Sequence, residues 1–222
     1  LDVSGKSPHT QVETAVGSIQ LGPLLKDLSG QDRVSGKGRF KANLDSRGNS
    51  INAIKRALDG NLEFRFEDGA VKGFNLGQMI REAKARFKGE ALPQSSQPQQ
   101  TDFSEMSGSA IIDNGVLSNQ DLLAKSPFLR VDGKGKVNLV DETLDYTVKA
   151  VIVSTDKGQG GEGLDELKGI PVPVHLTGPL ASPGFNINWG EVLVDTQKAK
   201  LEEKTQKLEQ KLQNEIEDKL KD

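Results

Sequence analysis

Few side chains in this sequence have the type and spacing that enzyme chemistry requires. The run Gly158-Gln-Gly-Gly-Glu-Gly163 matches the G-x-G-x-x-G pattern that binds dinucleotide phosphates where a strand leads into a helix. The helix that should follow has room for only about one turn before Ile170-Pro-Val-Pro173, and no ribose-binding acid sits on a second strand. The run therefore predicts a flexible loop and no nucleotide site.

The remaining candidates for catalysis or metal binding are equally isolated. His9 and His175 lie far apart in the sequence, and neither has an acidic or histidine neighbour at ligand spacing. The acidic pair Asp141-Glu142 is typical of a solvated turn. We therefore predict no catalytic residues, no metal and no cofactor.

Composition narrows the class of partner and the compartment. The 222 residues include 29 basic and 32 acidic side chains, and the net charge of -3 disfavours binding to nucleic acid. The absence of cysteine fits either the cytosol or the bacterial periplasm. No run reaches the roughly 18 apolar residues of a membrane-spanning helix. Because the chain starts at Leu1 and not at an initiator methionine, we expect a fragment or a processed form, whose membrane anchor, if it had one, lies upstream.

A strict alternation of side chains is the clearest structural signal. From Val34 to Leu44 the even positions are apolar or glycine and the odd positions are polar, which predicts a strand with two unlike faces. The segment Val131-Asp-Gly-Lys-Gly-Lys-Val137 repeats the pattern of residues 34–40. The chain is therefore expected to use the same kind of strand more than once.

The same reasoning gives the other elements. Further strands are expected at 62–66, 103–113, 131–139, 144–152, 172–176 and 185–189, with tight turns at Asp68-Gly69 and Asn114-Gly115. Short helices are expected at 21–28, at 50–59 after an N-cap at Ser50, and at 75–88 after an N-cap at Asn75. Prolines 171, 173, 179 and 183 indicate that the last two strands are edge strands.

These elements suggest four parts along the chain. Residues 1–90 and 102–190 are each expected to be mainly β, and residues 91–101 are expected to be a flexible linker or loop because they contain two prolines and little to bury. Residues 191–222 are expected to form a charged helix that projects from the sheet, since its leucine seam is narrow.

The apolar strand faces allow two architectures. One is a closed core, with the sheet packed against its helices. The other is a groove, because many apolar segments face few covering helices and glycines 36, 38, 133 and 135 allow a sheet to curve. We predict the second: a mainly β (α+β) fold in which a strongly curved antiparallel sheet forms a groove with short rim helices and a charged C-terminal helix. The side chains expected to line the groove are Val34, Phe40, Leu44, Leu62, Phe64, Phe66, Val137, Leu139, Leu144, Tyr146, Val148, Ile152, Val172, Val174 and Leu176.

Several strings along the chain resemble a known family. They are Val34-Ser-Gly-Lys-Gly-Arg-Phe40, Leu58-Asp-Gly-Asn-Leu-Glu-Phe64, Glu67-Asp-Gly-Ala-Val-Lys-Gly-Phe-Asn-Leu76, Thr101-Asp-Phe-Ser-Glu-Met106, Asp113-Asn-Gly-Val-Leu-Ser-Asn-Gln-Asp-Leu122, Leu129-Arg-Val-Asp-Gly-Lys-Gly-Lys-Val-Asn-Leu139 and Ile170-Pro-Val-Pro-Val-His-Leu-Thr-Gly178. In this order they resemble the C-terminal region of the AsmA family of Gram-negative bacteria, over roughly Leu21 to Leu193.

The resemblance implies a function. Members of that family are inner-membrane-anchored proteins with a large periplasmic part, and they are associated with outer-membrane biogenesis. Their β-grooves are thought to carry phospholipid between the two membranes, and the resemblance implies no catalytic residue. The expected partners are therefore phospholipid acyl chains and, through an upstream anchor, the inner membrane. The alternative is a non-transporting periplasmic scaffold, whose C-terminal helix would bind a protein involved in outer-membrane protein assembly.

Overall fold

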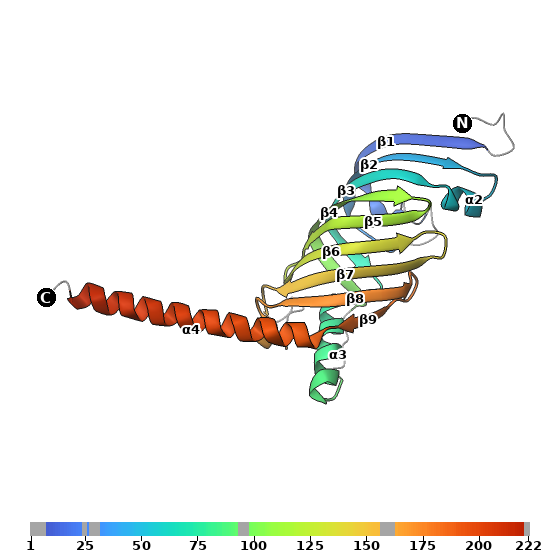
Figure 1. The fold of residues 1–222 in the computed structure, drawn as a ribbon. Helices are drawn as coiled ribbons and strands as arrows, with labels where there is room; N and C mark the ends of the chain where they lie inside the picture. Colours follow the sequence, from blue (N-terminus) through green and yellow to red (C-terminus); the bar gives the residue numbers. More distant parts are fainter. Residues whose placement is uncertain (1–7, 24–25, 27–31, 93–97, 156–162, 220–222) are drawn as a thin grey trace.

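The computed structural model describes residues 8–23, 26, 32–92, 98–155 and 163–219. Nine strands form one antiparallel sheet in chain order, and the sheet is not closed (Figure 1). The strands are β1 (His9–Gln20), β2 (Lys37–Arg47), β3 (Asp59–Lys72), β4 (Gln100–Asp113), β5 (Val116–Lys125), β6 (Leu129–Asn138), β7 (Thr143–Ile152), β8 (Pro171–Pro179) and β9 (Gly184–Ile187). The helices are α2 (Ile51–Arg56), α3 (Leu76–Lys88), the 3-10 turn η1 (Asp165–Leu167) and α4 (Trp189–Lys219). The predicted mainly β class with a curved antiparallel sheet is confirmed.

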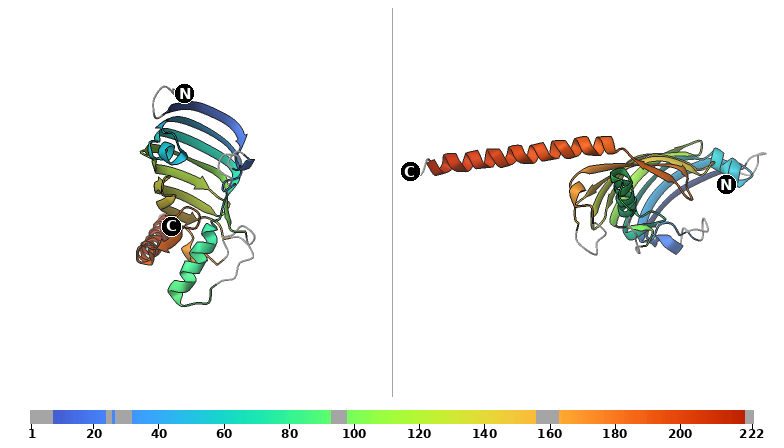
Figure 2. Two further views of the ribbon diagram at one scale, coloured as in Figure 1. Left: turned by 90° about the vertical axis from the view of Figure 1, so that its right-hand side faces the viewer. Right: turned by 90° about the horizontal axis from the view of Figure 1, so that it is seen from below.

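The sheet is strongly curved. Seen from below, it forms an arch, with α3 on the concave side and α4 extending away from the sheet (Figure 2). We call the concave side the inner face and the convex side the outer face. The outer face is turned toward the viewer in Figure 1.

The strands on either side of residues 91–101 belong to the same sheet. β3 pairs with β4 over their whole lengths, from Gly60 opposite Ile112 to Lys72 opposite Gln100. Gln100 and Thr101, which the sequence placed in the linker, are therefore strand residues. Residues 93–97 of the predicted linker lie outside the described residues.

The first predicted strand is shorter at its start than the alternation indicated. β2 begins at Lys37, and Val34 makes only an isolated bridge to Val71. Gly36 explains the interruption, because it has a φ of 113° and a Cβ there would lie 2.7 Å from the carbonyl oxygen of Glu67. The backbone of β3 comes so close to Gly36 that regular strand pairing is interrupted there, although the alternation of side chains predicted a continuous strand.

One of the two predicted tight turns is present and the other is not. Asn114 and Gly115 have φ values of 49° and 76° and connect Asp113 to its partner Val116, as expected for a two-residue hairpin. Asp68-Gly69 lies inside the continuous strand β3, so that prediction was wrong. Asp68 has the same positive φ of 49°, but it bends the strand without reversing it.

The rim helices begin where their caps predict. The Ser50 side chain accepts a hydrogen bond from the Ala53 amide, and the Asn75 side chain accepts one from the Gln78 amide. The first helix was expected to run to the glycine at position 60, but α2 ends at Arg56 and that glycine lies within β3. Of the predicted helix at 21–28, residues 21–23 are helical, while 24–25 and 27–31 lie outside the described residues.

The prediction that both proline-rich strands are edge strands was half wrong. β9 is an edge strand, but β8 pairs with β7 on one side and with β9 on the other. The β9 pairing covers only Val174–Thr177, and Pro171, Pro173 and Pro179 lie outside that stretch. Proline is therefore tolerated in a strand that is internal over only part of its length.

Candidate functional site: an apolar groove

The strand registers bring apolar side chains onto one face of the whole sheet. Directly paired residues share a face, and Val16 pairs with Phe40, which pairs with Phe64. At the other end of the sheet, a second ladder runs from β5 to β9 through Leu122, Gly133, Val148, Val174 and Ile187. These side chains lie on the inner face, so apolar residues line the concave side of the sheet toward both of its ends.

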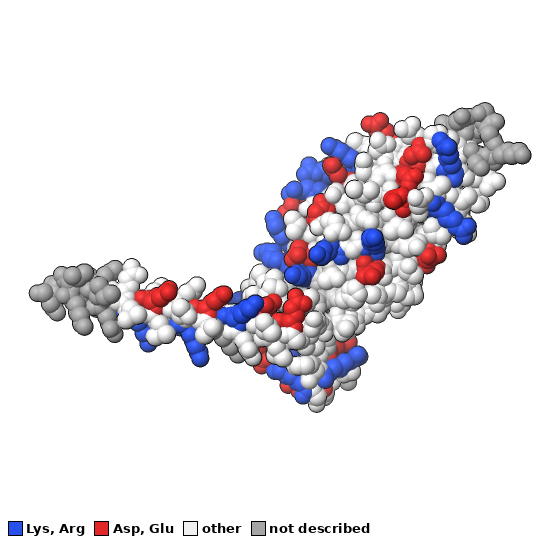
Figure 3. Space-filling view, in the orientation of Figure 1, with Lys and Arg blue, Asp and Glu red and all other residues white. Residues whose placement is uncertain are grey.

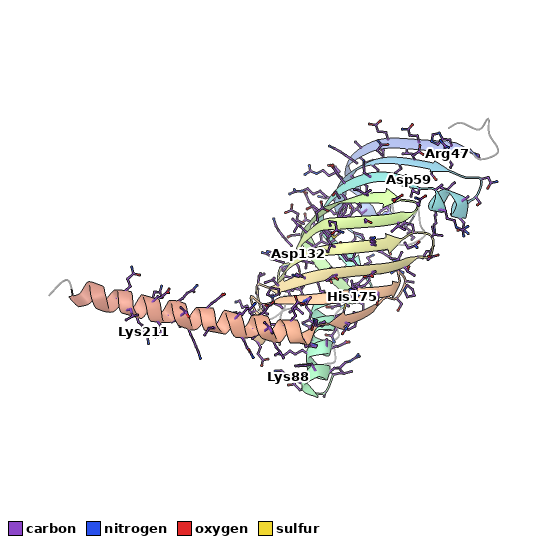
Figure 4. The ribbon with its side chains drawn as sticks, in the orientation of Figure 1. Arg47, Asp59, Lys88, Asp132, His175 and Lys211 are labelled. Atoms are coloured by element: carbon purple, nitrogen blue, oxygen red, sulfur yellow. The ribbon has the colours of Figure 1, made fainter. Side chains whose placement is uncertain are left out.

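The outer face is polar and carries both signs of charge (Figure 3). Glu105 lies between two basic partners, the Arg65 guanidinium and the Lys125 ammonium group, whose Nζ is 3.0 Å from Oε2. The hydrogen bond from Lys125, together with the charge of Arg65, holds the pKa of Glu105 below its ordinary value. Asp132 and His175 also belong to this face, on β6 and β8 (Figure 4). The outer face is therefore suited to water, and the inner face is suited to an apolar environment.

A cavity of about 1160 Å³ occupies the inner side of the arch. This volume exceeds the roughly 300–1,000 Å³ of ordinary small-molecule pockets. Apolar side chains make up most of its wall: Val34, Leu58, Val71, Phe74, Leu76, Met79, Phe103, Met106, Leu122, Ala124, Val131, Val137, Leu139, Leu144, Tyr146, Val148, Leu176, Leu180 and Ala181. The charged lining residues are Arg33, Lys55, Lys72, Asp102 and Glu142.

Charged and polar contacts join segments that line the cavity. The Lys55 Nζ is 2.8 Å from Glu142 Oε1, which connects the end of α2 to the β6–β7 turn. That hydrogen bond lowers the pKa of Glu142. The Arg33 Nη1 donates to the carbonyl oxygen of Leu180 at 3.4 Å and so connects the segment before β2 to the β8–β9 turn. The cavity is therefore bordered by polar groups around an apolar interior.

The inner face is covered at its C-terminal end. Ile80 of α3 and Val192 of α4 pack with Ile152, Val172 and Val174, and these side chains are fully buried or nearly so. This part of the face is a closed hydrophobic core. The cavity begins where that cover ends, since Leu76 and Met79 of α3 line it.

A small polar network interrupts the apolar floor. The Tyr146 hydroxyl donates to Asn119 Oδ1, and Asn119 Nδ2 donates to Asp121 Oδ1 at 2.8 Å. Asp121 also accepts the backbone amide of Ser109 at 2.8 Å, and this bond is the main reason that its pKa is lowered. Burial, with a smaller effect of the Asp121 charge, raises the pKa of Tyr146, so its hydroxyl stays protonated. The network fixes the bulge in β5, where pairing shifts between Asn119 and Leu122.

Ser126 is a second polar group in the wall of the cavity. Its side chain is 4% exposed. Among the residues that the structure describes, its Oγ is the one buried side-chain oxygen or nitrogen atom without a hydrogen-bond partner. A backbone hydrogen bond nevertheless closes the β5–β6 turn that contains Ser126, since the Ser126 amide donates to the Leu129 carbonyl at 2.9 Å.

The structure divides the predicted groove residues into four groups. Val34, Val137, Leu139, Leu144, Tyr146, Val148 and Leu176 line the main cavity. Phe40 and Phe64 line a smaller hollow of about 420 Å³, and Leu44, Leu62 and Phe66 lie on the same inner face outside both cavities. Ile152, Val172 and Val174 share the face but lie fully buried in the core under α3 and α4.

Sequence reasoning missed several lining residues. Leu122 and Ala124 face the cavity because the bulge in β5 restores their alternation, and no local signal places that bulge. Phe103 and Met106 both line the cavity although their spacing is odd, since the bend at Asp68 changes which residues face inward. Asp-Gly within a strand-like run was the only hint, and it was interpreted as a turn.

The two histidines lie on separate strands of the sheet. His9 contacts Asp45 on the neighbouring strand, while His175 lies on the outer face with Nδ1 3.1 Å from Thr147 Oγ1. Within residues 8–23, 26, 32–92, 98–155 and 163–219 no group of three or more potential metal ligands occurs. Most of the Gly158–Gly163 run lies outside the described residues. Among those described, no helix has the length and apolar character needed to cross a membrane.

Comparison with known proteins identifies the family. No solved structure matches the chain. Protein AsmA of Escherichia coli (strain K12) is 24% identical over 195 residues, which cover 87% of this chain and 31% of that protein. The chain therefore spans less than a third of the length of that relative. The sequence profile of the AsmA family matches residues 1–122, more than half of the chain. The chain belongs to the AsmA family.

Proposed function

We propose that this chain holds phospholipid acyl chains in its inner-face groove. It would act in the periplasm, as part of a protein anchored to the inner membrane, and carry phospholipid toward the outer membrane for outer-membrane biogenesis. The observation that supports this proposal is the apolar cavity of about 1160 Å³ on the concave face of an open sheet. Since the chain matches only 31% of its relative, we propose binding for this segment and transfer for the whole protein.

The physical chemistry of the groove suits an amphiphile. Each methylene that moves from water into an apolar environment contributes roughly 0.8 kcal/mol, and the cavity wall is mostly aliphatic. A phospholipid headgroup stays hydrated at the border, where Arg33 and Lys72 can meet phosphate and Asp102 can meet an ammonium group. The binding is expected to tolerate different acyl chain lengths, because the described wall of the cavity is mostly apolar.

Neighbouring leucines on β5 provide a matched test. Leu122 lines the cavity, whereas Leu123 is 58% exposed on the outer face. A carboxylate at position 122 would contact the acyl chain, and the same change at 123 would contact water. We expect Leu122→Asp to lose most of the phospholipid that co-purifies with the wild-type chain without detergent, and Leu123→Asp to retain it.

The measurement is mass spectrometry of extracted lipid, normalised to folded protein by circular dichroism. Equal lipid in the two variants would contradict the proposal, as would a wild-type chain that carries none. In the second case the scaffold interpretation would be preferred. One observation favours that interpretation: part of the inner face of β7 to β9, around Ile152, Val172 and Val174, is already closed by α3 and α4.

A further inference from the structure

From Val194 to Leu212, α4 carries an apolar seam that the rest of the described chain does not cover. Val194, Leu201, Leu208 and Leu212 are 52%, 67%, 62% and 58% exposed. In Figures 1 and 2 this part of the helix extends away from the sheet. The spacing of seven and four residues places these side chains along one side of the helix, at a and d positions of a heptad repeat with Thr205 between them.

The seam points away from the body of the protein. α4 attaches to the core through Val192, which is 1% exposed, and Ala199, which packs against the same cluster. Each residue turns an α-helix by about 100°, so Val194 and Leu201, two positions after these anchors, lie on nearly the opposite side. The contact with the sheet therefore leaves the seam free along its length.

The two flanks of the seam have opposite charges. Asp195, Glu202 and Glu209 follow one side, and Lys204 and Lys211 follow the other. Figure 3 shows acidic side chains along one edge of the projecting helix and basic side chains along the other. In heptad terms, the acidic residues occupy e positions and the lysines occupy g positions.

We propose that α4 joins two copies of this chain in a short parallel coiled coil. In a parallel pair each g position lies beside the e position of the following heptad in the second copy, so Lys204 meets Glu209 in both directions. An antiparallel pair would place acidic flank against acidic flank. The charge pattern therefore selects a second copy of the same chain in parallel as the occupant of the seam. This inference is independent of lipid binding.

Association is expected to be weak and dependent on concentration. The seam covers about three heptads, and it includes polar a positions at Lys198 and Thr205, which specify register but reduce stability. The parallel arrangement would bring two grooves to the same end of the coil, since each α4 begins at the last strand of its sheet.

Disulfide trapping tests the arrangement directly, because the chain contains no cysteine. Leu201→Cys and Leu208→Cys should each form a covalent dimer under mild oxidation, since identical d positions face each other in a parallel pair. Gln210→Cys lies on the opposite side of the helix and should remain monomeric. Antiparallel pairing can trap identical cysteines near only one crossing point. Trapping at one leucine site alone, or equal trapping at position 210, would overturn the proposal.

Sedimentation equilibrium of the full chain provides the second test. The wild type should dimerise reversibly at low ionic strength, and Lys204→Glu should raise the dissociation constant by roughly fourfold to thirtyfold, because it replaces two attractive contacts by two repulsive ones. Lys204→Glu combined with Glu209→Lys should restore most of the loss. A wild type that stays monomeric at all concentrations, or a double variant no tighter than the single one, would overturn the proposal.

Discussion

Two glycines form the floor of the groove at the points where neighbouring strands and side chains come closest to it. Gly133 lies beneath Leu122 and Tyr146, and a Cβ there would be 2.9 Å from atoms of both. Gly135 has a φ of 157°, and a Cβ there would lie 2.4 Å from the carbonyl oxygen of Asp145. The two glycines of the repeated Gly-Lys-Gly segment thus let large neighbours fill the inner face.

Gly135→Ala should therefore destabilise the fold. The added methyl group collides with the backbone of β7, and the cost is expected to be about 2 to 4 kcal/mol in the free energy of unfolding. Gly17→Ala is the matched control, since no atom lies within 4 Å of its Cβ position in β1. Urea denaturation measures both. A change at position 135 no larger than that at position 17 would contradict this explanation.

Two buried serines should respond in opposite directions. Ser46 and Ser126 are both 4% exposed, but the Ser46 Oγ donates to the Ile54 carbonyl at 2.7 Å, whereas the Ser126 Oγ has no partner. Ser126→Ala removes an unsatisfied hydroxyl and should leave the protein equally stable or more stable by about 1 kcal/mol. Ser46→Ala should cost about 1 kcal/mol. Thermal unfolding of the two variants decides this, and a clear loss at position 126 would show that its hydroxyl has a partner.

The hydrogen bonds of Asp121 should make part of the free energy of unfolding depend on pH. The Ser109 amide lowers the pKa of the folded carboxyl group, so the contribution of its charge is present above the unfolded pKa, near 4, and is lost as pH falls through the folded value. The difference in unfolding free energy between wild type and Asp121→Asn should thus be greatest at neutral pH and should shrink as pH falls through the lowered pKa of the folded carboxyl group. Urea unfolding at several pH values measures it. A difference that stays constant with pH would contradict the assigned role.

Among the elements, α4 combines two environments in one helix. Its first turns carry Val192, which belongs to the core, and its later turns expose the leucine seam. The sequence predicted the projecting helix from the narrow seam and the mixed charges. It did not predict the start at Trp189, because that residue also extends the alternation of the preceding strand.

Removing the projecting part of α4 should have little effect on the folded body. Deletion of residues 200–222 leaves Ala199 and Val192 in place, so the melting temperature in dilute solution should change by only a few degrees. Val192→Asp, by contrast, should prevent cooperative unfolding, because it buries a charge in the core. A large decrease in melting temperature on truncation would show that the distal helix packs against the sheet.

The strands were predictable from alternation, while their interruptions were not. Residues such as Val137, Leu144 and Tyr146 follow the period of two and face the cavity as expected. The bend at Asp68 and the bulge between Asn119 and Leu122 depend on pairing with neighbouring strands, which a local pattern does not contain. Alternation identifies a face, but only the covering helices decide which part of that face is core.

At the scale of the whole molecule, one apolar face serves two purposes. Under α3 and the start of α4 it is a closed core, and beyond them it borders a cavity of about 1160 Å³. The core supplies the burial that a thin curved sheet needs for stability. This division explains how the chain can keep an apolar surface open without losing its fold.

Site-specific photo-crosslinking tests most directly the proposal that the groove binds phospholipid. Val137 lines the cavity, and its neighbour Lys136 pairs with Asp145 on the outer face. A benzophenone side chain at position 137, irradiated in living Gram-negative cells, should form an adduct with the mass of a phospholipid, and the same group at 136 should form none. No phospholipid adduct at position 137, or equal adducts at 136 and 137, would contradict the account.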